Sequence, residues 1–335
     1  MKKYRITIAT PSVPPHIGGS VLYAEMFSRL WSLKGHIVRC VSFQSLQKIP
    51  TGLRHILYVV MLIPSVIYAD AVIALDTFSV ALPAVFMAKL FRKKVIVRVG
   101  GDFLWETYLN RTKEKIFLSD FYSPSRRFTY KERLIYTLTD MMFRYADRIV
   151  FSTEWQKRMY ESAYHIDTHK VSVIENAYPV RSRRNIVPKN RTILSPSRNI
   201  FLKNKQGLQE AFDIVKERFF DVELDTRTST HAELLQRMSN AYMVVIPSFS
   251  EVSPNMLLDA VSLGVPVVAT KDCGIKDRFS DVVVWVDPTN PQDIASGIEL
   301  LMDAKMYSEY MARMSKHTYA RGEDEVAEEF LLLIQ

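Results

Sequence analysis

The chain has 335 residues, more than one hydrophobic core usually contains, so two domains of about 150–180 residues are expected. Hydrophobic residues make up 48% and charged residues 24%, which excludes a disordered or collagen-like chain and is typical of globular proteins. The two cysteines, Cys40 and Cys273, exclude a disulfide framework and suit a reducing cytosol.

The formal net charge is +8, and the positive residues gather in three clusters, at 92–94, 126–133 and 181–189. No zinc finger, RNP motif or basic zipper accompanies them, so nucleic acid is not expected as a partner. Two interpretations stay open. The clusters can attract an anionic membrane surface, or they can form a solvated basic surface that also attracts an anionic substrate.

Apolar and amphipathic stretches alternate along the first half of the chain, and each pair predicts a strand followed by a helix. The first strand is expected at 5–10, and the helix after it, 20–34, is closed by Gly35. The apolar run 56–69 is too short to cross a bilayer and predicts a buried helix. The remaining strands are expected at 36–42, 71–75, 95–99, 148–152 and 171–174, and the remaining helices at 53–68, 79–91, 126–145 and 154–163.

The stretch 181–190 is polar, basic and interrupted by proline, as expected of a linker between domains. Strand and helix patterns then resume, with strands at 191–195, 242–246 and 265–269, and 307–335 is mostly helical. Repeated strand–helix units predict an α/β fold of two doubly wound, Rossmann-like domains with parallel sheets. We therefore expect a first domain at 1–180, a linker at 181–190, a second domain at 191–320 and a final helix at 321–335.

In doubly wound sheets, ligands bind where loops follow the carboxyl ends of strands. One such loop, 16–19, ends in Gly18-Gly19, which lets a ligand approach the backbone at a helix start, although a tight turn explains it equally well. Another loop places Asp102 directly after the strand 95–99. An acid there could orient or deprotonate a hydroxyl group, or it could cap the next helix. Trp105 and Glu106 are weaker candidates in the same loop.

The segment 247–270, PSFSEVSPNMLLDAVSLGVPVVAT, combines a strand end, a loop and a helix. Glu251 lies in the loop, and Ser253-Pro254 predicts an N-cap followed by proline at the first helical position. Asp259 lies about 9 Å along the helix axis. The helix start attracts anions such as a diphosphate, and carboxylates on either side of it can accept hydrogen bonds from sugar hydroxyls. Glu251 and Asp259 could instead be a helix-capping charge and a solvated helix residue.

This segment resembles the donor-binding motif of retaining family 4 glycosyltransferases of the GT-B fold, in which two glutamates are separated by seven residues. Here Glu251 is kept and Asp259 replaces the second glutamate. The resemblance implies that Glu251 binds the donor sugar, that Asp259 binds the ribose, and that the backbone of Ser253, Pro254, Asn255 and Met256 lies at the phosphates or sugar.

Further motifs extend the resemblance over nearly the whole chain. Arg198 and Lys203 match the family's R-x4-K element, which implies that they neutralise the donor diphosphate; Lys205 is the alternative if the loop shifts by two residues. The Gly18-Gly19 loop is similar to the family's glycine-rich loop, and GGDFLWE is similar to a string found in some members, which implies an acceptor-side role for Asp102.

Two features depart from the family pattern. Only nine residues, 221–229, stand where members have a strand, a glycine-rich loop, a helix and another strand, so the second domain is expected to be shortened. Several family glycines are replaced, by Ala177, Asn204 and Val252, which would be strained at a positive φ.

The resemblance implies a retaining glycosyltransferase that lies in the cytoplasm, either free or as a peripheral protein at the inner face of the membrane. It would use a nucleoside-diphosphate sugar as co-substrate, with no cofactor and no metal, and a glycan or lipid-linked acceptor. Two alternatives stay open: a non-catalytic, degenerate transferase acting as a partner subunit, and a nucleotide-sugar epimerase of related fold.

Overall fold

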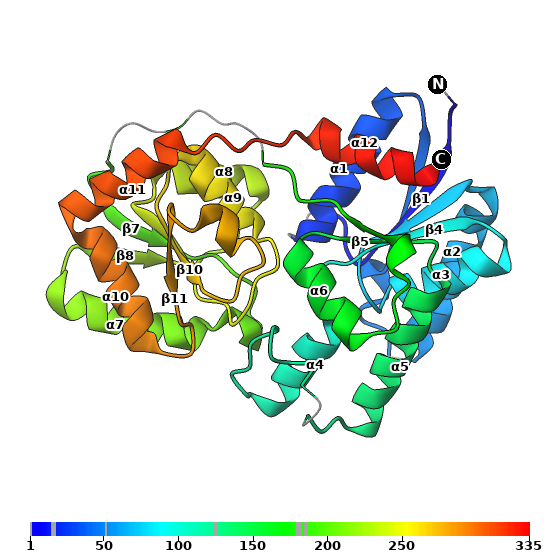
Figure 1. The fold of residues 1–335 in the computed structure, drawn as a ribbon, viewed down its shortest axis with the longest axis horizontal. Helices are drawn as coiled ribbons and strands as arrows, with labels where there is room; N and C mark the ends of the chain where they lie inside the picture. The colour runs from blue at the N-terminus through cyan, green and yellow to red at the C-terminus, as the bar shows by residue number, and fades with distance from the viewer. Residues whose placement is uncertain (1, 15–17, 51, 124–125, 179–182, 184–186) are drawn as a thin grey trace. The chain divides into compact units, whose positions relative to one another are not determined.

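The structure, a computed structural model, describes residues 2–14, 18–50, 52–123, 126–178, 183 and 187–335. The chain forms two compact units (Figure 1). The first contains residues 1–106, 125–176 and 322–335, and the second contains 107–124 and 177–321. Each unit is built on one parallel sheet, which confirms the α/β class.

The sheet of the first unit has the strand order β2-β1-β3-β4-β5-β6, and every pair is parallel. The four strands β1, β3, β4 and β5 are almost entirely buried, as expected of strands covered on both faces. The strands span β1 Arg5–Thr10, β2 Ile37–Ser42, β3 Ala71–Ala74, β4 Lys94–Arg98, β5 Arg148–Phe151 and β6 Val171–Val173.

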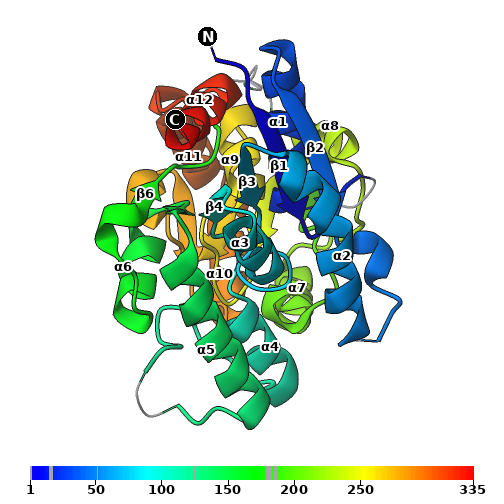
Figure 2. The same cartoon turned by 90° about the vertical axis from the view of Figure 1, so that its right-hand side faces the viewer.

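Helices cover both faces of this sheet, as right-handed crossovers require (Figures 1 and 2). Figure 2 looks onto the side of α2, α3 and α5, while α1 and α12 pack together on the other side. Trp31 of α1 donates a hydrogen bond from Nε1 to the carbonyl of Ala327 in α12, at 3.2 Å. The helices span α1 Gly19–Leu33, α2 Leu53–Tyr68, α3 Ala81–Leu90, α5 Tyr130–Tyr145, α6 Glu154–Ala163 and α12 Glu323–Ile334.

The predicted elements agree with the structure in type. The prediction of a buried helix at 56–69 is wrong in its burial, because α2 covers the sheet with one face only: Tyr58, Leu62 and Val66 are buried, whereas Ile56, Val60 and Ile67 are exposed. The helix expected at 126–145 begins at Tyr130, because Thr129 and Glu132 form a capping box. The helical stretch expected at 307–335 is two helices, α11 and α12, separated by residues 317–322. No helix of the described part of the chain is both long and apolar enough to cross a membrane.

The second unit has a five-stranded parallel sheet of order β11-β10-β9-β7-β8. Residues 221–229, where the sequence departs from the family pattern, contain the edge strand β8 and the loop that leads to α8. The strands span β7 Arg191–Leu194, β8 Val222–Asp225, β9 Met243–Ile246, β10 Val267–Thr270 and β11 Val283–Val286. The helices span α7 Lys205–Arg218, α8 His231–Asn240, α9 Asn255–Leu263, α10 Pro291–Met302 and α11 Ala304–Lys316.

The linker expected at 181–190 lies largely outside the described residues, which include only Arg183 and 187–190 of it. The Arg183 guanidinium donates to the carbonyls of Met314, Ser315 and His317, at 2.6, 2.8 and 2.5 Å. These carbonyls belong to the C-terminal end of α11, where the helix dipole favours a cation. Arg183 is therefore attached to the second unit.

Residues 107–124 belong to the second unit, although the sequence places them well inside the first domain. The helix α4, Phe103–Thr112, begins in the first unit and runs into this segment. Lys113 lies 5.2 Å from the ring centre of Phe201, and Lys271 lies 5.6 Å from that of Phe117. The segment therefore packs on loops at the carboxyl ends of β7 and β10.

Candidate active site

Glu251 and Lys203 form an ion pair at the carboxyl ends of β7 and β9. The Lys203 ammonium lies 2.5 Å from Oε1 of Glu251, and the side chains are only 22% and 15% exposed. The Glu251 backbone is held on both sides, by a bond from its N–H to the carbonyl of Asp272 (3.0 Å) and one from the N–H of Gly274 to its own carbonyl (2.9 Å). Two residues 48 positions apart are thus held together at the edge where parallel sheets bind ligands.

The position of Lys203 is set by the residue that follows it. Lys203 ends a short 3-10 helix, Phe201–Lys203, and Asn204 then adopts a left-handed conformation with φ 48°. Asn204 accepts a hydrogen bond from the N–H of Gly207 and donates one to the carbonyl of Pro288, at 3.3 and 2.7 Å. Asparagine tolerates this conformation well, so the replaced glycine is accommodated here. Ala177 and Val252 do not have positive φ angles, and the expected strain does not arise.

The neighbour of Glu251, Ser250, connects the site to the segment 107–124. Its hydroxyl accepts a hydrogen bond from the N–H of Leu118 (2.7 Å) and donates one to the carboxylate of Asp272. The N–H of Ser119 points at the same carboxylate, at 3.5 Å. This contact joins residues 132 positions apart, and no local motif predicted it.

The helix α9 provides the predicted helix start beside Glu251. It spans Asn255–Leu263 and ends at Gly264, which has φ 73°, as the sequence indicated. The predicted cap is wrong by one residue: Pro254, not Ser253, is the N-cap, and its carbonyl accepts from the N–H groups of Leu257 and Leu258. No acidic residue lies in the first turn, so no side-chain carboxylate of the first turn of α9 repels an anion at the helix start.

Asp259 is buried on α9 and is held by a histidine that sequence reasoning missed. Nε2 of His231 lies 2.9 Å from Oδ2 of Asp259. His231 is the first residue of α8, whose capping box is made by Thr230 and Glu233. The signal available in the sequence was this capping box, which places His231 at a helix start after the short loop 226–230.

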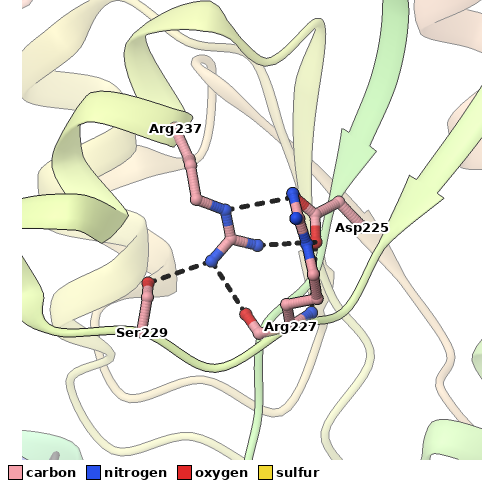
Figure 3. A network of polar contacts seen from close by, with 4 residues as sticks. All are labelled: Asp225, Arg227, Ser229 and Arg237. Carbon is pink, nitrogen blue, oxygen red and sulfur yellow. Dashed lines mark hydrogen bonds and ion pairs between the residues drawn. The ribbon is translucent and has the colours of Figure 1, made fainter.

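A network of charges holds that loop in place (Figure 3). Asp225, at the end of β8, accepts two bonds from the Arg227 guanidinium, at 3.0 and 2.9 Å, and one from Nε of Arg237, at 3.1 Å. Arg237 also donates to the carbonyl of Arg227 and the hydroxyl of Ser229, both at 2.9 Å. The loop between β8 and His231 is thereby fastened to α8. The Arg227 guanidinium, with Arg237, holds the pKa of Asp225 well below its usual range.

This network predicts a contribution to stability that depends on pH. Because the folded carboxyl has the lower pKa, the unfolded chain binds more protons once the pH falls below about 4. The contribution is complete above that pH and is lost as the pH falls through the folded pKa. Asp225→Asn should therefore be less stable than the wild type at pH 7, and the difference should shrink at pH 3. Urea unfolding at both values measures it; a difference independent of pH would contradict the prediction.

Arg198 is not brought into this cluster. Its side chain is exposed and makes no ion pair or hydrogen bond within the described ranges, although its carbonyl accepts from the N–H of Ile200 at 3.0 Å. Of the two predicted phosphate ligands, Lys203 is thus positioned beside Glu251, and Arg198 lies in the loop that leads to it. The alternative residue Lys205 is the first residue of α7.

In the first unit, Gly18 and Gly19 lie at the start of α1. Gly19 is the first helical residue, and Gly18 precedes it in an extended conformation, with no atom of the described residues within 4 Å of where a side chain would begin. No acidic residue lies in the first turn. His16 and Ile17, which complete the expected loop, lie outside the described residues. The start of α1 therefore lies at the carboxyl end of β1.

Asp102 caps the helix α4, which is the alternative that the sequence left open. Its Oδ1 accepts a hydrogen bond from the N–H of Trp105, and its Oδ2 accepts one from the hydroxyl of Tyr160, both at 2.8 Å. Asp102 as a whole is only 2% exposed. Burial raises the pKa of Tyr160 strongly, so this hydroxyl stays a donor. Both carboxylate oxygens are thus used to hold α4 against α6.

We therefore expect Asp102→Asn to keep turnover within about tenfold of the wild type, because an asparagine still caps a helix. If Asp102 were a general base, the same substitution would lower turnover by a factor of about 10² or more. Steady-state rates of the two proteins separate the roles. Asp102→Ala should lower the unfolding midpoint, since it removes the cap and leaves a buried tyrosine hydroxyl without this acceptor.

Sequence reasoning missed two charged side chains at the same edge. Asp76 follows β3, and its carboxylate accepts from the N–H groups of Val80 and Ala81, at 3.0 and 2.7 Å. Burial raises the pKa of Asp76 to about 6, although these N–H groups favour the charged form. Arg98, the last residue of β4, is buried under the ring of Tyr23. Both lie at the carboxyl ends of strands, which was the available signal.

Arg98 has polar partners but forms no ion pair within the described part of the chain. Its Nη2 donates to the hydroxyl of Ser152 (3.1 Å) and to Oδ1 of Asn176 (2.9 Å), and its Nε has no partner there. A buried guanidinium without a carboxylate is costly unless an anion approaches it. This edge of the first unit therefore favours a negatively charged group.

The sequence of the second unit matches a known family. Residues 221–321 match the model of "Glycosyl transferases group 1", a range that contains His231, Glu251 and Asp259. A D-inositol 3-phosphate glycosyltransferase of Paenarthrobacter aurescens is 38% identical over 85 residues, which are 25% of this chain. The match spans 21% of that relative's length.

Solved structures resemble the chain over almost its whole length. HepE of Anabaena, in a crystal structure with UDP and glucose, has a TM-score of 0.65 at 15% identity and covers 98% of each chain. WaaG, a glycosyltransferase involved in lipopolysaccharide biosynthesis, has a TM-score of 0.69 at 12% identity and covers 98% of this chain and 99% of its own. The chain therefore has the GT-B fold of glycosyltransferases, and its residues 221–321 match the glycosyl transferases group 1 family.

Proposed function

We propose that the protein transfers a sugar from a nucleoside-diphosphate sugar to an acceptor hydroxyl, with retention of anomeric configuration. The observation that carries this proposal is the Lys203–Glu251 pair, held beside the start of α9 in a sheet edge of the second unit. A cation, a carboxylate and a helix start together supply what a sugar diphosphate needs. The acceptor is a glycan or a lipid-linked sugar.

The residues of the candidate donor site have different roles in this reaction. Glu251 accepts hydrogen bonds from the donor sugar's hydroxyls, and Asp259, oriented by His231, accepts from the ribose. Lys203 and Arg198 bind the diphosphate, together with the backbone at 253–256. As the bond from the sugar's anomeric carbon to the diphosphate oxygen breaks, its electron pair leaves with the diphosphate. The acceptor oxygen bonds to that carbon from the same face and gives its proton to the departing diphosphate oxygen.

Negative charge grows on the departing diphosphate, and a fixed cation in a partly buried site stabilises it. Lys203 already lies against a carboxylate, so it is held in position before the donor binds. We propose that this cation, with Arg198, serves in place of a metal ion. Turnover should then be unchanged by excess EDTA, and a rate that returns only with added Mg²⁺ or Mn²⁺ would contradict this part.

The reaction is assigned to the cytoplasm, since both cysteines are free and a reducing compartment suits them. Arg98 and the start of α1 form the part of the first unit that binds the acceptor in this proposal, and they attract an anionic group on it. Asp102 is left out of the reacting groups because its oxygens hold α4.

The test is a calorimetric and thermal-shift screen against UDP, GDP, ADP and their sugar conjugates, with Lys203→Met alongside. Binding of one nucleotide should raise the unfolding midpoint, and the shift should grow with the logarithm of the ligand concentration once that concentration exceeds the Kd. The variant should lose this shift. Silence of the well-folded wild type across the panel would favour the non-catalytic partner subunit.

A second assay distinguishes the two enzyme classes. Incubated with the bound nucleotide sugar alone, a transferase should release nucleotide slowly by transfer to water. An epimerase would instead return a nucleotide sugar of altered configuration, visible by NMR, with no acceptor present. Epimer formation would overturn the proposed transfer reaction.

A further inference from the structure

A basic pocket lies at the amino ends of β4 and β5 in the first unit. Its volume is about 580 Å³. One carboxylate, that of Asp147, lies among six cationic side chains: Lys89, Arg92, Lys93, Lys94, Arg148 and Lys170. These strand ends are at the opposite edge of the sheet from Asp102 and the start of α1, so the proposed reaction does not use the pocket.

The single carboxylate cannot balance these charges. Asp147 is paired with Lys89 and also accepts from the N–H of Val95, at 2.9 Å. The ammonium groups of Lys94 and Lys170 reach only backbone carbonyls, those of Ile334 (3.2 Å) and Arg144 (3.0 Å). Helix C-termini attract cations, but each supplies only about half a negative charge. The pocket therefore keeps a strong excess of positive charge.

Arg92 and Lys93 form no ion pair or side-chain hydrogen bond within the described ranges, and Lys93 interacts with a carboxylate, that of Asp70, only through its charge. Arg92 also has a left-handed backbone, with φ 53°. It follows the end of α3, where the N–H of Lys93 bonds to the carbonyl of Ala88 at 2.7 Å. Glycine is the favoured residue at this position, and a larger side chain costs stability there. The arginine thus costs some stability at this position, and such residues are often found at functional sites.

Large apolar side chains are exposed on the last turns of the helices that lead to the pocket, α3, α5 and α12. Leu90, Tyr145 and Leu332 are 67%, 52% and 61% exposed. Leu90 ends α3 and Tyr145 ends α5, next in the chain to the pocket residues 89–94 and 147–148. Leu332 lies two residues before Ile334, the carbonyl partner of Lys94. Cations next to exposed apolar side chains are typical of surfaces that lie in the headgroup region of a bilayer.

We propose that this pocket is a docking site for a bilayer of anionic phospholipids, with lipid phosphates held by Arg92, Lys93 and Lys170. Leu90, Tyr145 and Leu332 then enter the boundary between headgroups and acyl chains. A strand of five residues is about 16 Å long, so the ligand edge of the sheet stays well away from this surface. Docking goes beyond the proposed reaction and does not depend on it.

The test is sedimentation of the full-length protein with vesicles of phosphatidylcholine alone, or of phosphatidylcholine with about 30 mol% phosphatidylglycerol. At this composition several anionic lipids meet the patch. The pocket variant is Arg92→Gly, Lys93→Gln and Lys170→Gln. It should fold, because glycine is favoured at the left-handed position. The matched control is Lys189→Gln, Lys305→Gln and Lys316→Gln, which removes the same charge from exposed positions of the second unit.

The wild type should bind the anionic vesicles and not the neutral ones, and salt should weaken the binding. The pocket variant should lose affinity on the order of 100-fold, and the control variant only a few-fold. Leu90→Ser with Leu332→Ser should lower the part of the binding that survives high salt. Equal losses in both charge variants, or no binding of anionic vesicles by the wild type, would overturn the proposal.

A soluble anion is the other source of the same phosphate chemistry, and a second arm separates it. Calorimetry with inorganic phosphate should show no saturable binding at millimolar concentration. Saturable phosphate binding that the pocket variant loses, without vesicle binding by the wild type, would mean a soluble-anion site and would refute docking. Donor turnover of the pocket variant should equal that of the wild type, so a failure of docking and a failure of the proposed reaction are seen separately.

Discussion

Glu251→Gln and Lys203→Met should each lower turnover by about 10²–10³-fold, the loss typical when a group aimed at developing charge is removed. In the proposed reaction Lys203 meets the leaving diphosphate and Glu251 binds the donor sugar, and the two side chains are paired in the structure. The glutamine keeps the shape of Glu251, so its effect reports the charge. Initial rates at saturating donor, with nucleotide release as the readout, measure both variants.

The two variants share one interaction, so their effects should not add. If the pair acts as a unit, the double variant should be about as slow as the slower single variant. The matched control is the Arg218–Glu299 pair of the same unit, at 2.8 Å, which joins α7 to α10. Arg218→Met and Glu299→Gln should leave turnover within about twofold. Wild-type turnover in both Glu251→Gln and Lys203→Met would refute the assignment of the site.

Asp259→Asn should weaken donor binding by about 10- to 100-fold and change kcat little. A hydrogen bond to a charged carboxylate contributes about 1.5–3 kcal/mol, and the ribose contact is the same in the ground and transition states. The KM for the donor and the Kd for the nucleotide alone should therefore rise together. A fall in kcat with an unchanged KM would contradict a ribose-binding role.

His231 gives this prediction a second readout. His231→Gln keeps a donor near Asp259, while His231→Ala leaves the carboxylate without the histidine that lies 2.9 Å away. If His231 positions Asp259, His231→Ala should raise the nucleotide Kd several-fold, and His231→Gln should restore most of the affinity. Equal affinity in wild type and His231→Ala would show that α9 alone positions the carboxylate.

Local rules determined much of this protein from its sequence. The alternation of apolar stretches predicted two parallel sheets, and the C-terminal end of α9 was predicted because helical periodicity and the glycine at its end act within a few residues. The N-cap was predicted one residue too early. The Ser253-Pro254 pair fits a serine N-cap followed by a helical proline, but it also fits the observed start, in which Pro254 itself is the N-cap. The candidate donor residues 251–259 were found because they occur within one strand–loop–helix unit.

Only the tertiary structure decided which distant residues meet. Residues 107–124 pack into the second unit, His231 meets Asp259, and Leu118 bonds Ser250, each across a separation that no local pattern encodes. Packing likewise decided how Asp102 is held, because Tyr160, 58 positions later, supplies the second hydrogen bond to the carboxylate that caps α4. Periodicity and capping depend on neighbours in the chain, whereas burial and pairing depend on how complete elements pack against one another.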